Sequence, residues 1–142
     1  MITFKLKSDP SSTSLIDLKQ IDFLETWLEI LKNLFNPFAE NFFMGFSKSR
    51  FNSINSYIQR SRPNEHEHAR PHDDKSIMVF RVALNSYNDY ESGGIRFIRY
   101  NCSVNKLRKG WALVFPSVIT HYFENMEVSE GVSYWLLSYI DS

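Results

Sequence analysis

The chain has 142 residues, which fits a single domain that buries about two-thirds of the surface its unfolded form exposes. Sixteen basic residues balance sixteen acidic ones, so the chain lacks the net positive field that draws proteins to nucleic acid or anionic membranes. Twelve Phe, seven Tyr and three Trp supply large rings for a core. The composition therefore predicts a folded globular protein and excludes nucleic acid as an expected partner.

The cysteine count and the N-terminus indicate the expected compartment. The single Cys102 cannot form an internal disulfide, so nothing in the chain requires an oxidising environment. The first ten residues contain charges and lack the apolar region and cleavage site of a signal peptide. No apolar run approaches the roughly 18 residues that span a bilayer. We expect a cytoplasmic chain without a transmembrane segment.

The first third of the chain predicts helices. Residues 1–15 are expected to form an entry loop, and residues 16–45 a helical support. Apolar residues recur at three- and four-residue spacing over 23–35, which predicts a helix of about four turns with one broad apolar face. An Asn-Pro pair at 36–37 then supplies an N-cap and a first helical position, so a second helix is expected over 38–44.

From residue 54 onward, short aromatic and β-branched runs alternate with turn residues, as in an antiparallel sheet. Strands are predicted at 54–60, 76–85, 95–101, 111–116, 118–123 and 132–140. Runs that are apolar on both faces imply two packed sheets with the helices on an outer face. The predicted fold class is α+β: a double-stranded β-helix, or jelly roll, with two N-terminal helices on one sheet. Residues 1–142 form one domain, with a β core over 54–141.

A His-x-Asp pair, His72 and Asp74, directly precedes a predicted strand. An imidazole and a carboxylate at the mouth of a strand are two of the three ligands of a non-haem iron site. The bare motif also arises by chance, so its position before a buried strand is what favours a metal site. A second cluster, His66, Glu67 and His68, lies among loop residues. We interpret it as a solvated polar loop near the site entrance rather than a second metal site.

Six stretches of the chain, the first of which contains the His72–Asp74 pair, carry a family resemblance. They are Arg-Pro-His-Asp-Asp (70–74), Val-Ala-Leu-Asn (82–85), Tyr-Glu-Ser-Gly-Gly-Ile-Arg-Phe-Ile-Arg-Tyr-Asn-Cys (90–102), Arg-Lys-Gly-Trp-Ala-Leu-Val-Phe-Pro (108–116), Thr-His-Tyr (120–122) and Ser-Tyr-Ile-Asp (138–141). In this order they resemble the C-terminal hydroxylase domain of the procollagen lysyl hydroxylases, from about residue 16 to the end. The resemblance implies an Fe(II)- and 2-oxoglutarate-dependent dioxygenase with a protein or peptide partner, for example a collagen-like one. Family members work in the endoplasmic reticulum lumen, often as dimers, so a homodimer is one state to test.

The resemblance carries over residue by residue only where the motif is present. His72 and Asp74 match the first two iron ligands of the family. The third ligand, a His, falls at Phe123 here. The Arg that anchors 2-oxoglutarate falls at Ser133, and the Tyr that helps to hold it falls at Ser61. Two other pocket positions of the family, an Asn and a Cys, are replaced by arginine at position 81 and isoleucine at position 95.

These replacements lead to two hypotheses. Phe123 has no lone pair for a metal, and Ser133 cannot neutralise a carboxylate, so the first hypothesis is a catalytically degenerate domain that binds a protein partner. The second is an active hydroxylase with a rebuilt site, in which His121 completes the set of His72 and Asp74 and Arg81 anchors 2-oxoglutarate. On a strand, His121 lies about 6.5 Å from position 123 on the same side, so this needs a bulge or register slip.

A third hypothesis concerns folding rather than chemistry. The chain has neither the upstream domains nor the signal peptide of the family it resembles. The third hypothesis is therefore a piece of a longer protein, or a duplicated tail, that folds only with a partner.

Overall fold

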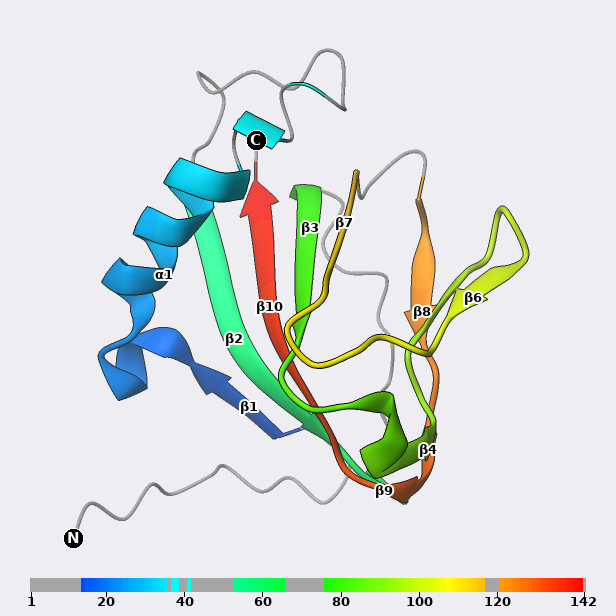
Figure 1. Ribbon diagram of the computed structural model, residues 1–142. Helices are drawn as coiled ribbons and strands as arrows, with labels where there is room; N and C mark the ends of the chain where they lie inside the picture. The colour runs from blue at the N-terminus through cyan, green and yellow to red at the C-terminus, as the bar shows by residue number, and fades with distance from the viewer. Residues whose placement is uncertain are drawn as a thin grey trace, which may run out of the picture.

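A five-stranded antiparallel sheet forms the middle layer of the fold, between a helical layer and two smaller sheets (Figure 1). The computed structural model describes residues 14–35, 37–38, 41, 53–65, 76–116 and 121–141. In spatial order the strands of the central sheet are β1 (Ser14–Asp17), β2 (Ser53–Ser61), β10 (Ser133–Asp141), β3 (Ser76–Ala83) and β7 (Ala112–Pro116). The smaller sheets pair β4 (Tyr90–Ser92) with β9 (Val128–Gly131), and β5 (Ile95–Phe97) with both β6 (Cys102–Val104) and β8 (Phe123–Asn125).

The helical layer covers one face of the central sheet (Figure 1). It consists of a 3₁₀ turn (Leu18–Ile21), α1 (Leu24–Ile30) and a π-helical turn (Leu31–Phe35). Three side chains of these turns, Leu18, Trp27 and Leu31, are buried against the sheet. On the sheet side, the same cluster contains Met78 and Phe80 of β3 and Leu136 and Ile140 of β10. The predicted helix over 23–35 is thus present, and its last turn, Leu31–Phe35, is π-helical rather than α-helical. Residues 37–38 and 41 are helical, and the rest of the predicted second helix lies outside the described residues.

Two parts of the strand prediction were wrong. Residues 14–17 form a strand that pairs with β2, where an entry loop and the start of the helical support were expected. The predicted strand over 95–101 ends at Phe97, because the chain turns back at 98–101 and continues as β6. Asn101 adopts a positive φ of 48° in this turn, a conformation that Asn tolerates better than most residues.

The remaining strands agree with the prediction or were missed. The strands predicted at 54–60, 76–85, 111–116 and 132–140 are present within two residues of their ends. β8 begins where the strand predicted at 118–123 was expected to end, and residues 117–120 lie outside the described part of the chain. β4 and β9 were missed, because short, mostly exposed strands carry little hydrophobic periodicity.

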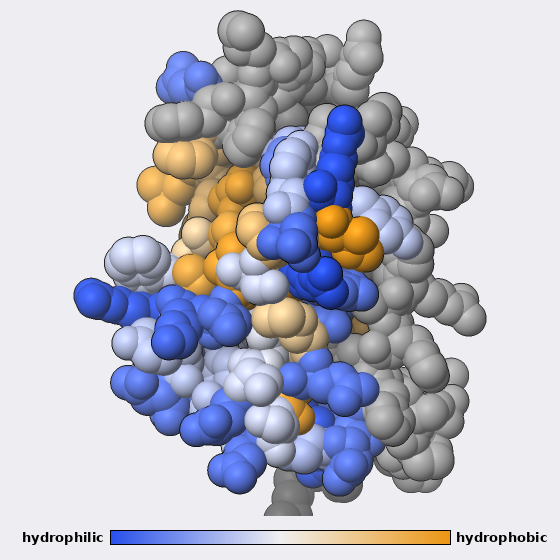
Figure 2. Space-filling model, turned by 90° about the vertical axis from the view of Figure 1, so that its right-hand side faces the viewer, coloured by the Kyte–Doolittle hydropathy of each residue, from blue (hydrophilic) through white to orange (hydrophobic). Residues whose placement is uncertain are grey.

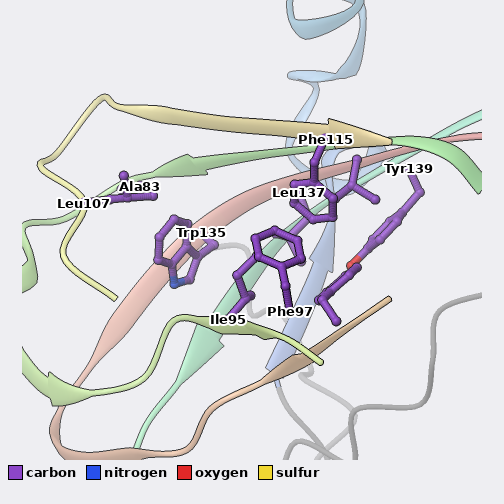
Figure 3. Close-up of a cluster of buried hydrophobic side chains, with 10 residues drawn as sticks. Ala83, Ile95, Phe97, Leu107, Phe115, Trp135, Leu137 and Tyr139 are labelled. Carbon is purple, nitrogen blue, oxygen red and sulfur yellow. The ribbon is translucent and has the colours of Figure 1, made fainter. Parts of the chain in front are cut away.

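A second core lies between the central sheet and the smaller sheets (Figure 3). Alternate residues of the central strands point into it, while their neighbours point toward the helices. Figure 3 shows Trp135 and Leu137 of β10 facing Ile95 and Phe97 of β5 across this layer. The structure thus confirms the predicted arrangement of two packed sheets with helices outside, although the sheets do not close on each other. Within the described residues, no helix has the length and apolarity to cross a membrane.

Candidate functional site

The interior face of the central sheet carries an unusual number of buried polar side chains. Gln59 and Ser61 of β2, Arg81 of β3 and Ser133 of β10 are all buried. Strand alternation places them on the same face as the second core, since Tyr57, Val79 and Trp135 flank them at two-residue spacing. The interior between the two sheets therefore holds the candidate site.

Ser61 and Ser133 lie directly opposite each other on adjacent strands. They form one register pair between β2 and β10, which places their Cβ atoms about 5 Å apart. Both are buried, with 6% and 1% of their surface exposed. The structure thus brings together the two positions at which the resemblance expects the Tyr and the Arg of the 2-oxoglutarate site. Two small hydroxyls now occupy this place, and neither can supply a positive charge.

Phe123 lies inside a cluster of aromatic rings. It pairs with Phe97 across β5 and β8, and its ring makes an edge-to-face contact with Phe115 at a centroid distance of 5.1 Å. Phe97 contacts Phe115 in the same way at 5.0 Å. Ile95, the other replaced position on β5, is buried in the same core. At the position where the resemblance expects the third iron ligand, the structure therefore has a well-packed apolar side chain, which offers no lone pair to a metal.

His121 lies against the edge of this cluster. Its ring centroid is 5.6 Å from that of Phe97, 6.3 Å from that of Phe115 and 5.2 Å from that of Tyr100. The ring thus faces the same cluster as Phe123. Burial, and to a smaller extent the positive charge of Arg99, lowers the pKa of His121 and favours the neutral imidazole. A neutral imidazole is the form that binds metals.

The other proposed iron ligands cannot be placed. His72 and Asp74 lie outside the described residues, as do 66–68. The described part of the chain contains no group of three or more His, Cys, Asp or Glu side chains that could hold a metal.

Arg81 is buried in the interior with 2% of its surface exposed. Its guanidinium donates a hydrogen bond to Oδ1 of Asn125 and lies 5.0 Å from the ring centroid of Trp135. It also opposes the rise in the pKa of Tyr90 that burial causes. Arg81 pairs with Leu137, four residues and about 13 Å along β10 from Ser133. A carboxylate bound by Arg81 would therefore sit farther along the same face of the central sheet, away from the paired serines.

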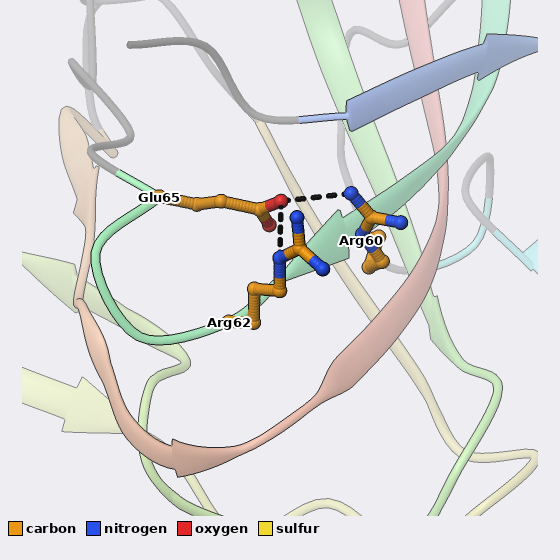
Figure 4. A network of polar contacts seen from close by, with 3 residues as sticks. All are labelled: Arg60, Arg62 and Glu65. Atoms are coloured by element: carbon orange, nitrogen blue, oxygen red, sulfur yellow. Dashed lines mark hydrogen bonds and ion pairs between the residues drawn. The ribbon is translucent and has the colours of Figure 1, made fainter. Parts of the chain in front are cut away.

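An ion-pair cluster at the end of β2 was missed by sequence reasoning (Figure 4). Oε1 of Glu65 accepts a hydrogen bond from Arg60 Nη2 and forms an ion pair with Arg62 Nε, both at 2.8 Å. The backbone N–H of Glu65 also donates to the carbonyl of Arg62, and Asn64 has a positive φ of 65°. The cluster fixes the direction in which the chain leaves Ser61. The Arg-x-Arg-x-x-Glu spacing after a strand was the available signal.

Comparison with known proteins identifies relatives. A multifunctional procollagen lysine hydroxylase and glycosyltransferase of Rattus norvegicus is 40% identical over 128 residues, and a procollagen-lysine,2-oxoglutarate 5-dioxygenase of Drosophila melanogaster is 38% identical over 127. Each match covers 89% of this chain but only 17% and 18% of the relative, so the chain spans less than a fifth of their length. No family model matches the chain.

Solved structures agree on the fold. The viral collagen prolyl hydroxylase of Paramecium bursaria Chlorella virus-1 matches with a TM-score of 0.55 and 14% identity, over 92% of this chain and 80% of that one. A prolyl-4-hydroxylase of Pseudomonas putida matches with a TM-score of 0.57 and 15% identity, over 91% and 69%.

Together these comparisons confirm the resemblance and the jelly-roll fold. The chain is homologous to the procollagen lysyl hydroxylases and has the fold of a dioxygenase-like domain. These relatives give no support to the cytoplasmic location expected from the N-terminus, because the resemblance places the family in the endoplasmic reticulum lumen.

Proposed function

We propose that this homologue of the procollagen lysyl hydroxylases is a catalytically degenerate dioxygenase domain that acts by binding a protein or peptide partner, for example a collagen-like one. One observation carries the proposal. Phe123, at the position of the third iron ligand, is packed edge-to-face on Phe115 and faces Phe97 inside an apolar cluster. A side chain held in this way has no lone pair to offer to a metal.

The paired serines support the same conclusion for the cosubstrate. A carboxylate moved from water into a buried site needs a cation or several hydrogen-bond donors, and otherwise its desolvation is strongly unfavourable. Ser61 and Ser133 offer hydroxyl groups but no charge. We therefore expect weak binding both of Fe(II), which retains only His72 and Asp74, and of 2-oxoglutarate.

Calorimetric titration of the anaerobic protein with Fe(II), with and without 2-oxoglutarate, tests the proposal. Wild type should show no tight stoichiometric site, and the double variant Phe123→His, Ser133→Arg should gain one. Adding His72→Ala to the double variant is the matched control, since it should remove the gained binding if iron occupies the expected site. Tight Fe(II) binding by wild type, with turnover of 2-oxoglutarate, would overturn the proposal.

A second candidate, an active peptidyl-lysine hydroxylase with a rebuilt site, is favoured by two observations. His121 faces the same cluster as Phe123, and Arg81 supplies a buried guanidinium on the interior face. This candidate predicts that His121→Gln abolishes iron binding by wild type and that Arg81→Gln weakens 2-oxoglutarate binding. Unchanged iron binding in a His72→Ala variant would reject it.

A further inference from the structure

Positive charge is concentrated in one segment of this chain. Residues 96–109 contain five basic side chains and no Asp or Glu: Arg96, Arg99, Lys106, Arg108 and Lys109. The whole chain has a formal net charge of zero. The local excess therefore produces a field that the overall balance hides.

This segment forms the β5–β6 hairpin, which projects from the right-hand side of the molecule in Figure 1, and the loop that then runs back toward β7. All five basic residues are exposed. Leu107, in contrast, is buried in the second core and anchors the loop through apolar packing. Figure 2 shows this side: strongly hydrophilic side chains stand beside hydrophobic ones. Exposed apolar or aromatic residues alternate with the basic ones, namely Ile98, Tyr100 and Trp111.

β6 is the edge strand of its sheet. The order β6-β5-β8 leaves one side of β6 without a partner among the described strands, and Cys102 and Ser103 are exposed. An edge strand can accept an additional extended segment through its free backbone groups. Arg99 precedes this edge along the chain, and Lys106 and Lys109 follow it. A peptide that paired with β6 would therefore have positively charged side chains near each of its two ends.

Several of these cations are available to a ligand. Arg96 already contacts Glu124 at 3.6 Å and Asn101 at 2.9 Å, and Arg108 lies over the Trp111 ring at 5.6 Å. In contrast, Arg99, Lys106 and Lys109 form no ion pair within the described part of the chain.

We propose that this surface, the β6 edge with its flanking cations, binds an acidic peptide in extended conformation. Its carboxylates would lie against Arg99 at one end and against Lys106 and Lys109 at the other, and its apolar side chains would cover Ile98 and Tyr100. The charge pattern favours a peptide over a nucleic acid. Arg99, Lys106 and Lys109 lie toward the two ends of β6, and the exposed residues Cys102 and Ser103 between them carry no charge, so a continuous row of phosphates would lack partners there. Because the surface lies outside the interior, the inference does not rest on the loss of the iron site.

Fluorescence anisotropy with the full chain tests this inference in buffer containing a chelator, so that iron binding cannot contribute. The probe is a labelled Glu-Leu-Glu-Leu-Glu-Leu peptide, compared with its Gln-Leu counterpart. The variant Arg99→Glu, Lys106→Glu should lose about tenfold or more in affinity, and 0.5 M salt should weaken wild-type binding. The variant Lys19→Glu, Lys32→Glu makes the same charge change at exposed sites in the helical layer and should lose less than about twofold.

Three results would overturn the inference: equal binding of the Gln-Leu peptide, equal loss in the two variants, or tighter binding of an oligothymidylate that displaces the acidic peptide. If circular dichroism shows that the charge reversal unfolds the chain, Arg99→Gln, Lys106→Gln replaces it, with an expected loss of about threefold. Since the iron titration is a separate measurement on the same protein, failure of either proposal leaves the other standing.

Discussion

The two faces of the central sheet are built differently. The face under the helices is an apolar core with two buried serines that are both hydrogen-bonded: Ser138 Oγ accepts from Nε1 of Trp27 at 2.6 Å and lies 2.7 Å from Oγ of Ser56. The interior face instead buries a cation, an amide and two serines on three adjacent strands, at Gln59, Ser61, Arg81 and Ser133.

This contrast distinguishes a face that only stabilises the fold from a face with the composition of a binding site. Buried polar groups cost free energy unless they are paired, so a purely structural face contains few of them, as the helix face does. The interior face has the polar character of a binding site, including the buried charge of Arg81. Under the proposed function, this polarity is what remains of a dioxygenase site that lacks its third iron ligand and its 2-oxoglutarate anchor.

The largest effect is expected on the helix face. Trp27→Ala removes a buried ring and its hydrogen bond to Ser138, and should cost about 3–5 kcal/mol in the free energy of unfolding, measured by urea denaturation. Leu34→Ala, on the same helical layer but 67% exposed, is the control and should change stability by less than about 0.5 kcal/mol. A loss below about 1 kcal/mol for Trp27→Ala would show that the helices do not cover the sheet in solution.

Arg81→Met tests the interior face with a side chain of similar length. It leaves Oδ1 of Asn125 without this donor and removes the contact with the Trp135 ring, so a loss of about 1–3 kcal/mol is expected by the same denaturation. Arg96→Met, which removes a guanidinium that is about half exposed, should cost less than about 0.5 kcal/mol. A more stable Arg81→Met variant would mean that the buried charge is maintained for binding at the expense of stability.

Glu65→Gln tests the cluster that directs the chain out of β2. The amide oxygen keeps a hydrogen-bond acceptor but loses the charge that faces Arg60 and Arg62, so a loss of about 0.5–1 kcal/mol is expected. Glu91→Gln on exposed β4 makes the same exchange without a described ion pair and is the control. Equal stability of the two variants would show that the cluster contributes nothing to folding.

The sequence predicted the layers better than the details. Long apolar runs such as 76–84 identified the packed sheets, and the spacing of Trp27 and Leu31 identified the helix face, because burial imposes these periods over many residues. Short elements were not predicted: β1, β4 and β9 have three or four residues, too few to show the two-residue hydrophobic period of a strand. The chain reversal after Phe97 was hidden by an aromatic run that continues through the turn.

The candidate site was predictable only through the family resemblance. Nothing in local spacing indicates that Ser61 and Ser133, 72 positions apart in sequence, form a register pair, since strand pairing depends on the whole topology. The contacts of Arg81 were equally inaccessible, because its partners lie on β8 and β10. The sequence did predict that His121 and Phe123 share a side, and the ring contacts of both with Phe115 agree with this.

The smallest effect is expected from the titration of His121, at the border between the aromatic cluster and solvent. Burial and Arg99 lower its pKa in the folded state below the ordinary value of 6.5, so below pH 6.5 the unfolded state binds more protons than the folded state. Stability should therefore be fully present above pH 6.5 and fall as the pH drops from 6.5 through the lowered pKa. The difference in Tm between pH 7.5 and pH 5.5 should shrink in His121→Gln. Arg99→Gln should reduce this difference in Tm less, because Arg99 is the weaker of the two causes. Arg96→Gln, which removes the same charge elsewhere on the hairpin, serves as the control.

An identical pH dependence in wild type and His121→Gln would mean that the imidazole is as exposed to water in the folded protein as in the unfolded chain. The packing of His121 against Phe97 and Phe115 would then have to be abandoned.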